Sequence, residues 1–343
     1  MPHFILLTGA GFSKNWGGWL ADEAFEYLLG HPRIDDGLRK LLWKHKDGGF
    51  EAAVEEQRIE TARSTESYRA ERDAAVRSSM MGVTSNIPML DHSQRLDDAI
   101  RGMFTDMNKA FGAIPLEFSN QTQYLIRNFL VRFDAIFTLN QDLLLEQHYL
   151  DDITSAYSIR QWNGGHMPGM RRWPGQGNQM PIDTKWSPAK QSEFVIEKRL
   201  QPFFKLHGSS NWFADVNGEP MLIIGGNKAS AIDRFEILRW NLEQFGEHLS
   251  KRDTRLMVIG YSFGDEHINE AISDAADGDL RLFIIDPLGV DVLNRNPLTT
   301  LFPDSPLARM QSRLRGASRR TLSQIFGGDL VEHGKVMRFF TSA

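Results

Sequence analysis

The sequence predicts an α/β fold built on a doubly wound parallel sheet, with a large helical insertion. Short apolar runs that end in glycine or polar turn residues alternate with helical patterns along most of the chain. This alternation is typical of parallel strands joined by crossover helices. Residues 35–130 interrupt it, because no convincing strand occurs there. We therefore expect one domain over 1–343, with residues 35–130 as a helical insertion.

The first predicted strand ends in a glycine turn. Residues 4–7 are apolar, as expected of a buried parallel strand, and Gly9 and Gly11 follow closely. A helix is expected to begin near residues 15–17, because apolar residues recur behind the turn at helical spacing: Leu20, Ala24, Phe25 and Leu28. Backbone amides at such a turn hold a dinucleotide pyrophosphate at the end of a strand. The turn therefore favours a Rossmann-like fold, although Lys14 replaces the third glycine of the standard fingerprint.

Composition narrows the class of protein. The chain has 343 residues, of which 41% are hydrophobic and 24% charged, and its net charge is −5. This balance does not favour direct binding to nucleic acid. The absence of cysteine excludes disulfides and thiolate zinc sites. No basic segment precedes the first apolar run, which Gly9 interrupts, so we expect a core strand there, no membrane span, and a cytoplasmic protein.

The remaining elements follow in order. Within the helical stretch we expect helices at 38–42, 50–81, 96–111 and 122–133. The later strands are expected at 134–140, 202–206, 221–224, 255–259 and 280–285, the last being the final clear strand. Helices are expected at 141–149, 235–248 and 266–275. Residues 160–188 are rich in Gly, Pro, Trp and Asn and read as a lid, a binding loop or an assembly surface.

Four motifs stand at the carboxyl ends of predicted strands, where an open α/β sheet binds its ligand. They are Gly9-Ala10-Gly11-Phe12-Ser13, Thr138-Leu139-Asn140-Gln141-Asp142, Lys205-Leu206-His207-Gly208-Ser209 and Gly260-Tyr261-Ser262-Phe263-Gly264. Taken together and in this order, they resemble the motifs of the sirtuin family. The resemblance covers the sheet-forming parts of the chain and leaves 35–130 unexplained.

The resemblance implies a role for each matching residue. Asn140 and Asp142 would flank the nicotinamide ribose, and His207 would be the base, placed at a strand end outside the core. These three residues form the expected catalytic set. The residues expected to bind NAD are Thr8, Gly9, Ala10, Gly11, Phe12, Ser13, Gly260, Ser262 and Asp286. No metal is expected: the closest histidines in sequence, His31 and His45, are too far apart for one helical turn.

Departures from the family favour hydrolysis over deacylation. Leu139 stands where sirtuins usually have glutamine, residues 15–24 lack the family's Pro-Asp-Phe-Arg run, and there are no cysteines for its zinc module. With no acyl-lysine bound, water is the natural nucleophile at the oxocarbenium-like centre that forms when nicotinamide leaves. A histidine takes up the proton at neutral pH. The chain thus resembles the sirtuin-like NAD hydrolases of bacterial antiphage defence, with NAD as substrate.

Two other functions remain open. Residues 260–264 match the G-x-S-x-G nucleophile elbow, and Asp286 and His333 follow Ser262 in the order that an α/β-hydrolase triad requires. A serine hydrolase would leave the first glycine turn and Asn140 unused. The second alternative is a non-catalytic nucleotide-binding subunit.

The resemblance also implies partners and a gate. The tail at 300–343 carries five arginines in what we expect to be one short helical stretch: Arg309, Arg313, Arg315, Arg319 and Arg320. We expect this tail and the helical insertion to build a homo-oligomer. Uncontrolled NAD hydrolysis would kill the host, so we expect the isolated chain to be largely latent. A HerA-type ATPase encoded nearby is the expected partner, and the loop 162–181 the expected moving part.

Overall fold

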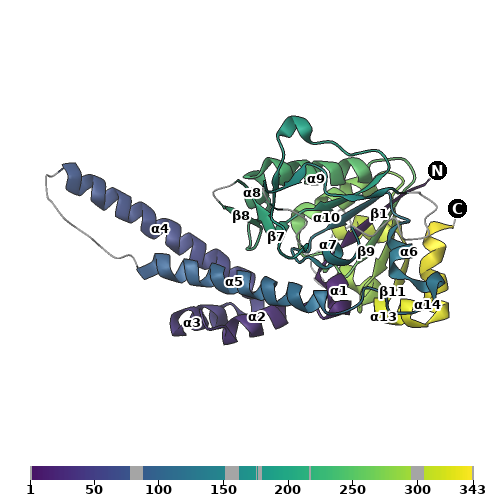
Figure 1. Cartoon of the computed structure of the whole chain (residues 1–343), viewed down its shortest axis with the longest axis horizontal. Helices are drawn as coiled ribbons and strands as arrows, with labels where there is room; N and C mark the ends of the chain where they lie inside the picture. The colour runs from purple at the N-terminus through teal and green to yellow at the C-terminus, as the bar shows by residue number, and fades with distance from the viewer. Residues whose placement is uncertain are drawn as a thin grey trace. The chain divides into compact units, whose positions relative to one another are not determined.

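The computed structural model describes residues 2–77, 88–150, 162–174, 176, 180–215, 218–294 and 305–341. The chain divides into two compact units. The first comprises residues 1–18, 107–223 and 229–343, and the second comprises 19–106 and 224–228. Figure 1 labels their helices and strands. No described helix is long and apolar enough to cross a membrane.

A seven-stranded parallel sheet is the centre of the first unit, in the order β11-β10-β9-β1-β2-β6-β3. The strands are β1 His3–Thr8, β2 Ala135–Thr138, β3 Gly164–His166, β6 Leu200–Lys205, β9 Thr254–Ile259, β10 Arg281–Ile285 and β11 Leu314–Ser318. The chain places β2 and β6 on one side of β1, and later β9 to β11 on the other. The strand order therefore reverses between β1 and β9, and this switch point confirms the doubly wound α/β prediction.

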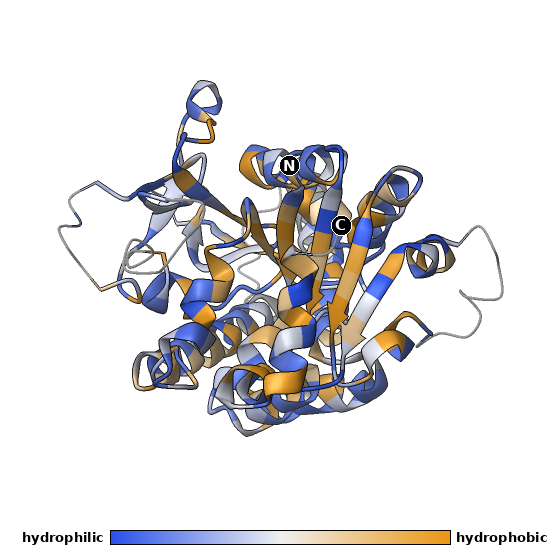
Figure 2. Cartoon of the chain, turned by 90° about the vertical axis from the view of Figure 1, so that its right-hand side faces the viewer, coloured by the Kyte–Doolittle hydropathy of each residue, from blue (hydrophilic) through white to orange (hydrophobic). Residues whose placement is uncertain are grey.

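Helices cover both faces of this sheet. Alternate residues of β1 point to opposite faces. Ile5 and Leu7 join one buried cluster with side chains of α9 Glu236–Leu249, α10 Glu266–Ala276 and α12 Pro306–Arg313. On the other face, the Phe4 ring contacts those of Phe339 and Phe340. Figure 2 shows the strands as the most hydrophobic part of the unit, as burial on both faces requires.

The remaining helices of the first unit are short. They are α1 Ala10–Ser13, α6 Ile126–Leu130, α7 Leu144–His148, α8 Lys228–Asp233, α13 Leu322–Gly327 and α14 Leu330–Met337. A second sheet, of order β4-β5-β7-β8, consists of β4 Met170–Arg172, β5 Trp186–Pro188, β7 Gly208–Phe213 and β8 Pro220–Leu222. The expected loop at 160–188 is thus partly strand. Residues 160, 161, 175 and 177–179 lie outside the described residues.

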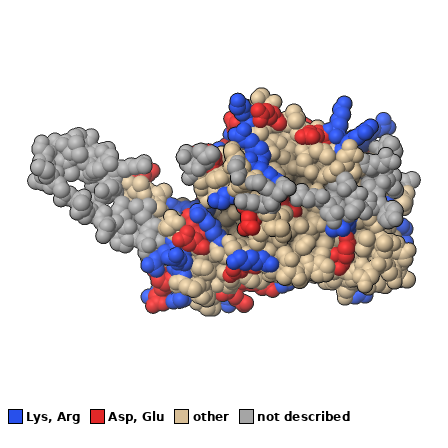
Figure 3. Space-filling view, viewed as in Figure 1, with Lys and Arg blue, Asp and Glu red and all other residues tan. Residues whose placement is uncertain are grey.

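The second unit is helical. It contains α2 Ala21–Gly30, α3 Asp36–Lys44, α4 Phe50–Arg77 and the first part of α5 Pro88–Gly112. Buried Leu96, Ile100 and Met103 follow helical spacing on α5. Pro88 starts α5 and does not break it, since proline is tolerated at the first helical position. Acidic and basic side chains are interspersed on the face drawn in Figure 3. The helical character expected here is confirmed.

The helix behind the first strand begins earlier than expected. α1 starts at Ala10, and a 3₁₀ turn over Lys14–Trp16 ends at Gly17, whose φ is 82°. This left-handed residue stops the helix. The apolar residues used to predict a helix from 15–17 belong to α2, which starts only at Ala21 in the second unit.

The arginine-rich tail is not one helix. α12 ends at Arg313, Arg315 lies in β11, and Arg319 follows that strand. β11 was not predicted because its five residues include only two aliphatic side chains and a glycine. Gly316 fits there because a Cβ would lie 2.6 Å from the Phe283 ring of β10. Packing against a neighbouring strand thus decides the conformation.

Two glycine loops meet at the switch point. The amides of Gly9 and Gly11 donate hydrogen bonds to the carbonyls of Ile259 and Gly260, at 3.0 and 2.9 Å. Gly260 has a φ of 62°, and a Cβ on it would lie 2.3 Å from the Gly11 carbonyl carbon. A Cβ on Gly9 would lie 2.6 Å from the Gly260 oxygen. The two loops approach so closely that a side chain fits neither at Gly9 nor at Gly260.

Gly260→Ala is expected to destabilise the protein by about 3 kcal/mol or more, because it combines a left-handed residue with a backbone clash. Gly246→Ala is the matched control: Gly246 lies inside α9 with open space around its Cα. There alanine is expected to stabilise by up to about 1 kcal/mol. Urea unfolding of both variants checks this. Equal effects of the two substitutions would contradict the role given to Gly260.

The amino end of β1 carries a buried histidine cluster. His3 Nε2 lies 3.1 Å from His248 Nδ1, and His3 Nδ1 lies 3.2 Å from Asp134 Oδ2. Asp134 Oδ2 also accepts a hydrogen bond from the Phe4 amide. The pKa of His248 is lowered to about 3, mainly by burial and also by the charges of Lys251 and His3, while Asp134 opposes the shift. His248 is therefore neutral in the folded protein at neutral pH.

This histidine is expected to weaken the protein in acid. Below pH 6.5 the unfolded chain takes up a proton on His248, whereas the folded chain does so only near pH 3. Between these values its contribution to stability falls by up to about 1.4 kcal/mol per pH unit as the pH falls. His248→Asn is expected to flatten the fall in unfolding free energy between pH 6 and 4. An unchanged pH profile in urea unfolding would refute this assignment.

Candidate functional site

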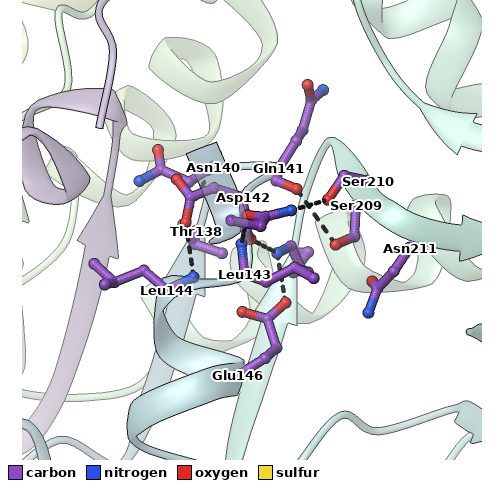
Figure 4. A network of polar contacts seen from close by, with 12 residues as sticks. Thr138, Asn140, Gln141, Asp142, Leu143, Leu144, Glu146, Ser209, Ser210 and Asn211 are labelled. Atoms are coloured by element: carbon purple, nitrogen blue, oxygen red, sulfur yellow. Dashed lines mark hydrogen bonds and ion pairs between the residues drawn. The ribbon is translucent and has the colours of Figure 1, made fainter. Parts of the chain in front are cut away.

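A hollow opens at the carboxyl ends of β1, β2 and β6. It has a volume of about 180 Å³, part of it open to solvent, and is lined by Thr8, Phe12, Ser13, Thr138, Asn140, Asp142, Leu145, Glu146, Phe203 and Lys205. Five of the residues predicted from the sequence line it together: Thr8, Phe12, Ser13, Asn140 and Asp142. Figure 4 shows polar contacts around Asn140, Asp142 and Glu146.

A chain of hydrogen bonds joins the ends of β1 and β2. The Thr8 hydroxyl donates to Thr138 Oγ1 at 2.7 Å, and the same oxygen accepts from the Asn140 amide at 3.0 Å. The Asn140 side chain donates from Nδ2 to Ser13 Oγ at 2.9 Å. Its Oδ1 accepts no hydrogen bond from a described residue, so it is available to a hydroxyl or a water. These hydrogen bonds fix the orientation of the Asn140 side-chain amide.

Asp142 lies beside Asn140 and is almost fully buried. One of its carboxylate oxygens, Oδ1, accepts from the Leu144 amide at 3.0 Å and so holds the turn that leads into α7. The helix expected from residue 141 begins only at Leu144. The N-cap of this helix is Leu143, and the Asn140 side chain, which donates to Ser13, lies at the hollow.

A buried ion pair forms one wall of the hollow. Lys205, with no exposed surface, places Nζ 2.6 Å from Glu146 Oε1 and also donates to the Asp142 carbonyl oxygen. Burial raises the pKa of Glu146, and the Lys205 charge opposes this rise. Sequence reasoning singled out neither residue. The available signal was a lysine inside the otherwise apolar run of 203–206.

His207 lies in the turn between β6 and β7, at the end of a strand as expected. Its ring is not outside the core, however: only 3% of the residue is exposed, and it is not among the residues that line the hollow. Its Nε2 lies 3.1 Å from Nε2 of His267, on the first turn of α10. One of these nitrogens must donate the hydrogen bond and the other accept it. His267, which is half-buried, was missed because the two histidines are 60 residues apart.

The glycine loop differs from expectation in one respect. The amides of Gly9 and Gly11 are bonded to the β9 loop and do not point at an open site. Ala10 and Ser13 form the short helix α1 directly behind β1, and the Ser13 hydroxyl reaches the hollow. Gly9, Gly11 and Gly260 thus bring two loops together beside the hollow.

The serine hydrolase constellation is not assembled. Ser262 is exposed and its side chain makes no hydrogen bond within the described chain. The residues with positive φ in its turn are Gly260 and Phe263, whereas a nucleophile elbow places the strain on the serine. His333 packs against the rings of Tyr124 and Phe326. The Asp286 carboxylate accepts from the Leu288 amide at 2.8 Å and so stabilises its own turn.

No group of three or more acidic or histidine side chains within the described ranges is placed to hold a metal ion. The polar side chains of the hollow are hydroxyls, an amide, two carboxylates and one ammonium. Such a set is able to bind a hydroxyl-bearing, cationic or amide-bearing organic group by hydrogen bonds.

Comparison with known proteins adds a family match. A protein-family model described as a SIR2-like domain matches residues 134–290, somewhat less than half of the chain. This segment contains Asn140, Asp142, His207 and Ser262, and the match supports a sirtuin-like family and NAD-dependent chemistry of the sirtuin type. None of the curated proteins compared matches the chain.

Solved structures of Sir2 proteins are similar at low identity. Sir2Tm bound to a propionylated peptide has a TM-score of 0.40 and 11% identity, covering 97% of this chain and 94% of that chain. A Sir2 homologue–NAD complex has a TM-score of 0.39 and 12% identity, covering 98% and 90%. At this level of similarity, the fold is established by the sheet topology of the chain itself.

Proposed function

We propose that the chain hydrolyses NAD⁺ to nicotinamide and ADP-ribose at this hollow, as an effector of antiphage defence. The observation that carries the proposal is the shared hollow of Thr8, Ser13, Asn140 and Asp142 at the carboxyl ends of β1 and β2. The SIR2-like match over 134–290 supports it. The hydroxyl, amide and carboxylate groups that line the hollow suit hydrogen bonds to the nicotinamide ribose.

The proposed reaction breaks the bond between the nicotinamide nitrogen and C1′ of the ribose. Electrons of that bond leave with nicotinamide, and an oxocarbenium-like centre develops at C1′. Asn140 Oδ1 orients the attacking water, while the Asp142 carboxylate stabilises the positive charge that develops on the ribose. Because His207 does not itself line the hollow, the proton released by water passes to it through one intervening water; His207 shares a hydrogen bond with His267.

Asn140→Ala is expected to lower the rate of nicotinamide release about 100-fold, because water loses its orienting group. His207→Gln is expected to lower it by about 100-fold or more through loss of the base. Glu243→Ala, at an exposed position of α9 outside the hollow, is the control and should keep the wild-type rate. The assay follows free nicotinamide by chromatography, with thermal melting of each variant to verify folding. Wild-type rates in both site variants would overturn the assignment.

Lysine deacylation is expected to be absent or trivial. The chain lacks the cysteines of a zinc module, so no platform of that type supports an acyl-lysine peptide. A panel of acetylated peptides incubated with NAD⁺ should keep its acetyl groups, and EDTA should leave the melting temperature unchanged. Robust NAD-dependent removal of acetyl groups would contradict the proposal in favour of a deacylase.

Assembly and control belong to the same proposal. The proposal includes a homo-oligomer built through the helical insertion and the tail at 300–343, a largely latent isolated chain, and a HerA-type ATPase as the activating partner. The arginine-rich tail supports the oligomer, the harm of uncontrolled NAD hydrolysis supports the latency, and the resemblance stated from the sequence motifs supports the ATPase partner. Arg315 and Arg319 are exposed, which leaves them accessible to a second chain.

A further inference from the structure

The buried ion pair of the hollow connects two strand ends that the sequence keeps far apart. Lys205 is the last residue of β6 and stands in register with Thr138, the last residue of β2. The Leu206 amide donates to the Thr138 carbonyl at 2.9 Å, which continues the pairing by one residue. His207 then follows on one strand and Asn140 on the other. Lys205 therefore lies at the end of the pairing between β2 and β6, just before the segments that carry Asn140 and His207.

The Lys205 ammonium crosses from β6 to the segment after β2. One of its contacts is Glu146 Oε1 on α7, at 2.6 Å, and another is the carbonyl oxygen of Asp142. The backbone of Lys205 is held from the other side, because Asn241 of α9 donates to its carbonyl at 3.1 Å. A lysine that is hydrogen-bonded through both its backbone carbonyl and its Nζ has little freedom to move. The turn that its ammonium contacts is restrained with it.

Stability alone gives no reason for such a pair. Taking two charges out of water costs about as much as their attraction returns, and apolar residues of the same volume are often equally stabilising. Lys205 is fully buried and Glu146 is 6% exposed. The Phe203 ring lies 5.9 Å from the same ammonium. What the pair provides, and apolar residues do not, is a directed bond to the Asp142 backbone.

We propose that Lys205 is a positioning residue, whose ammonium fixes the turn 140–142 against the end of β6 so that Asn140, Asp142 and His207 keep one geometry. The proposal rests on the NAD hydrolysis proposed above. A misplacement of about 1 Å is enough to lower a rate about 100-fold. Lys205 acts through its neighbours and is not itself required to touch the substrate.

The test separates positioning from stability. Lys205→Met leaves Glu146 buried without its partner, so the melting temperature and kcat should both fall. The double variant K205M/E146M removes both charges; its melting temperature should return toward the wild-type value, while kcat stays about 100-fold low and KM changes only a few-fold. Recovery of kcat together with the melting temperature in the double variant would overturn the proposal.

A second measurement does not depend on turnover. Hydrogen exchange over residues 139–144 should be faster in K205M/E146M than in the wild type, and unchanged exchange would also overturn the proposal. Tyr149→Phe is the matched control: it removes a buried hydrogen bond to Gln201 beyond the end of α7. It should lower the melting temperature and keep kcat. A wild-type chain that releases no nicotinamide, alone or with its partner, would refute the proposed function, while the exchange comparison still decides the role of Lys205.

Discussion

The approach of two backbone loops at the switch point is the constraint on which the site depends. Gly9 and Gly11 after β1 bond to the loop that contains Gly260 after β9, at distances that exclude any Cβ. Since β1 and β9 are neighbours in the sheet, this contact sets where the chain leaves β1. The first turn of α1 and the Ser13 hydroxyl are placed by that exit. The amide of Asn140 is oriented in turn by Ser13.

Polarity at the carboxyl edge of the sheet is the second feature of the molecule. The hydroxyls of Thr8 and Thr138 and the charges of Lys205 and Glu146 are buried there. Buried polar groups of this kind weaken a fold unless they are fully bonded. Here each has at least one bonded partner. Local departures from an apolar core are expected where a sequence serves function as well as stability.

The sequence allowed much of the sheet to be predicted, and less of the site. β1, β2, β9 and β10 are built on continuous apolar runs, and such runs are typical of strands that are buried on both faces. β11 escaped prediction because its conformation depends on the Phe283 ring against Gly316. Asn140 and Asp142 were found because they directly follow a strand. The partners of His207 and Glu146 were not, since His267 and Lys205 are 60 and 59 residues distant from them and only folding brings each pair together.

The central position of β1 has a consequence for how the protein is made on the ribosome. Its hydroxyl partner Thr138 is 130 residues further along the chain, and the histidine that closes its amino end is 245 residues from His3. The Asn15 side chain just behind β1 accepts a hydrogen bond from an amide 307 residues later. During synthesis this hydrophobic strand therefore waits for β2 and still longer for β9, its two neighbours in the sheet. Such an exposure favours aggregation of the newly made chain before its sheet is complete.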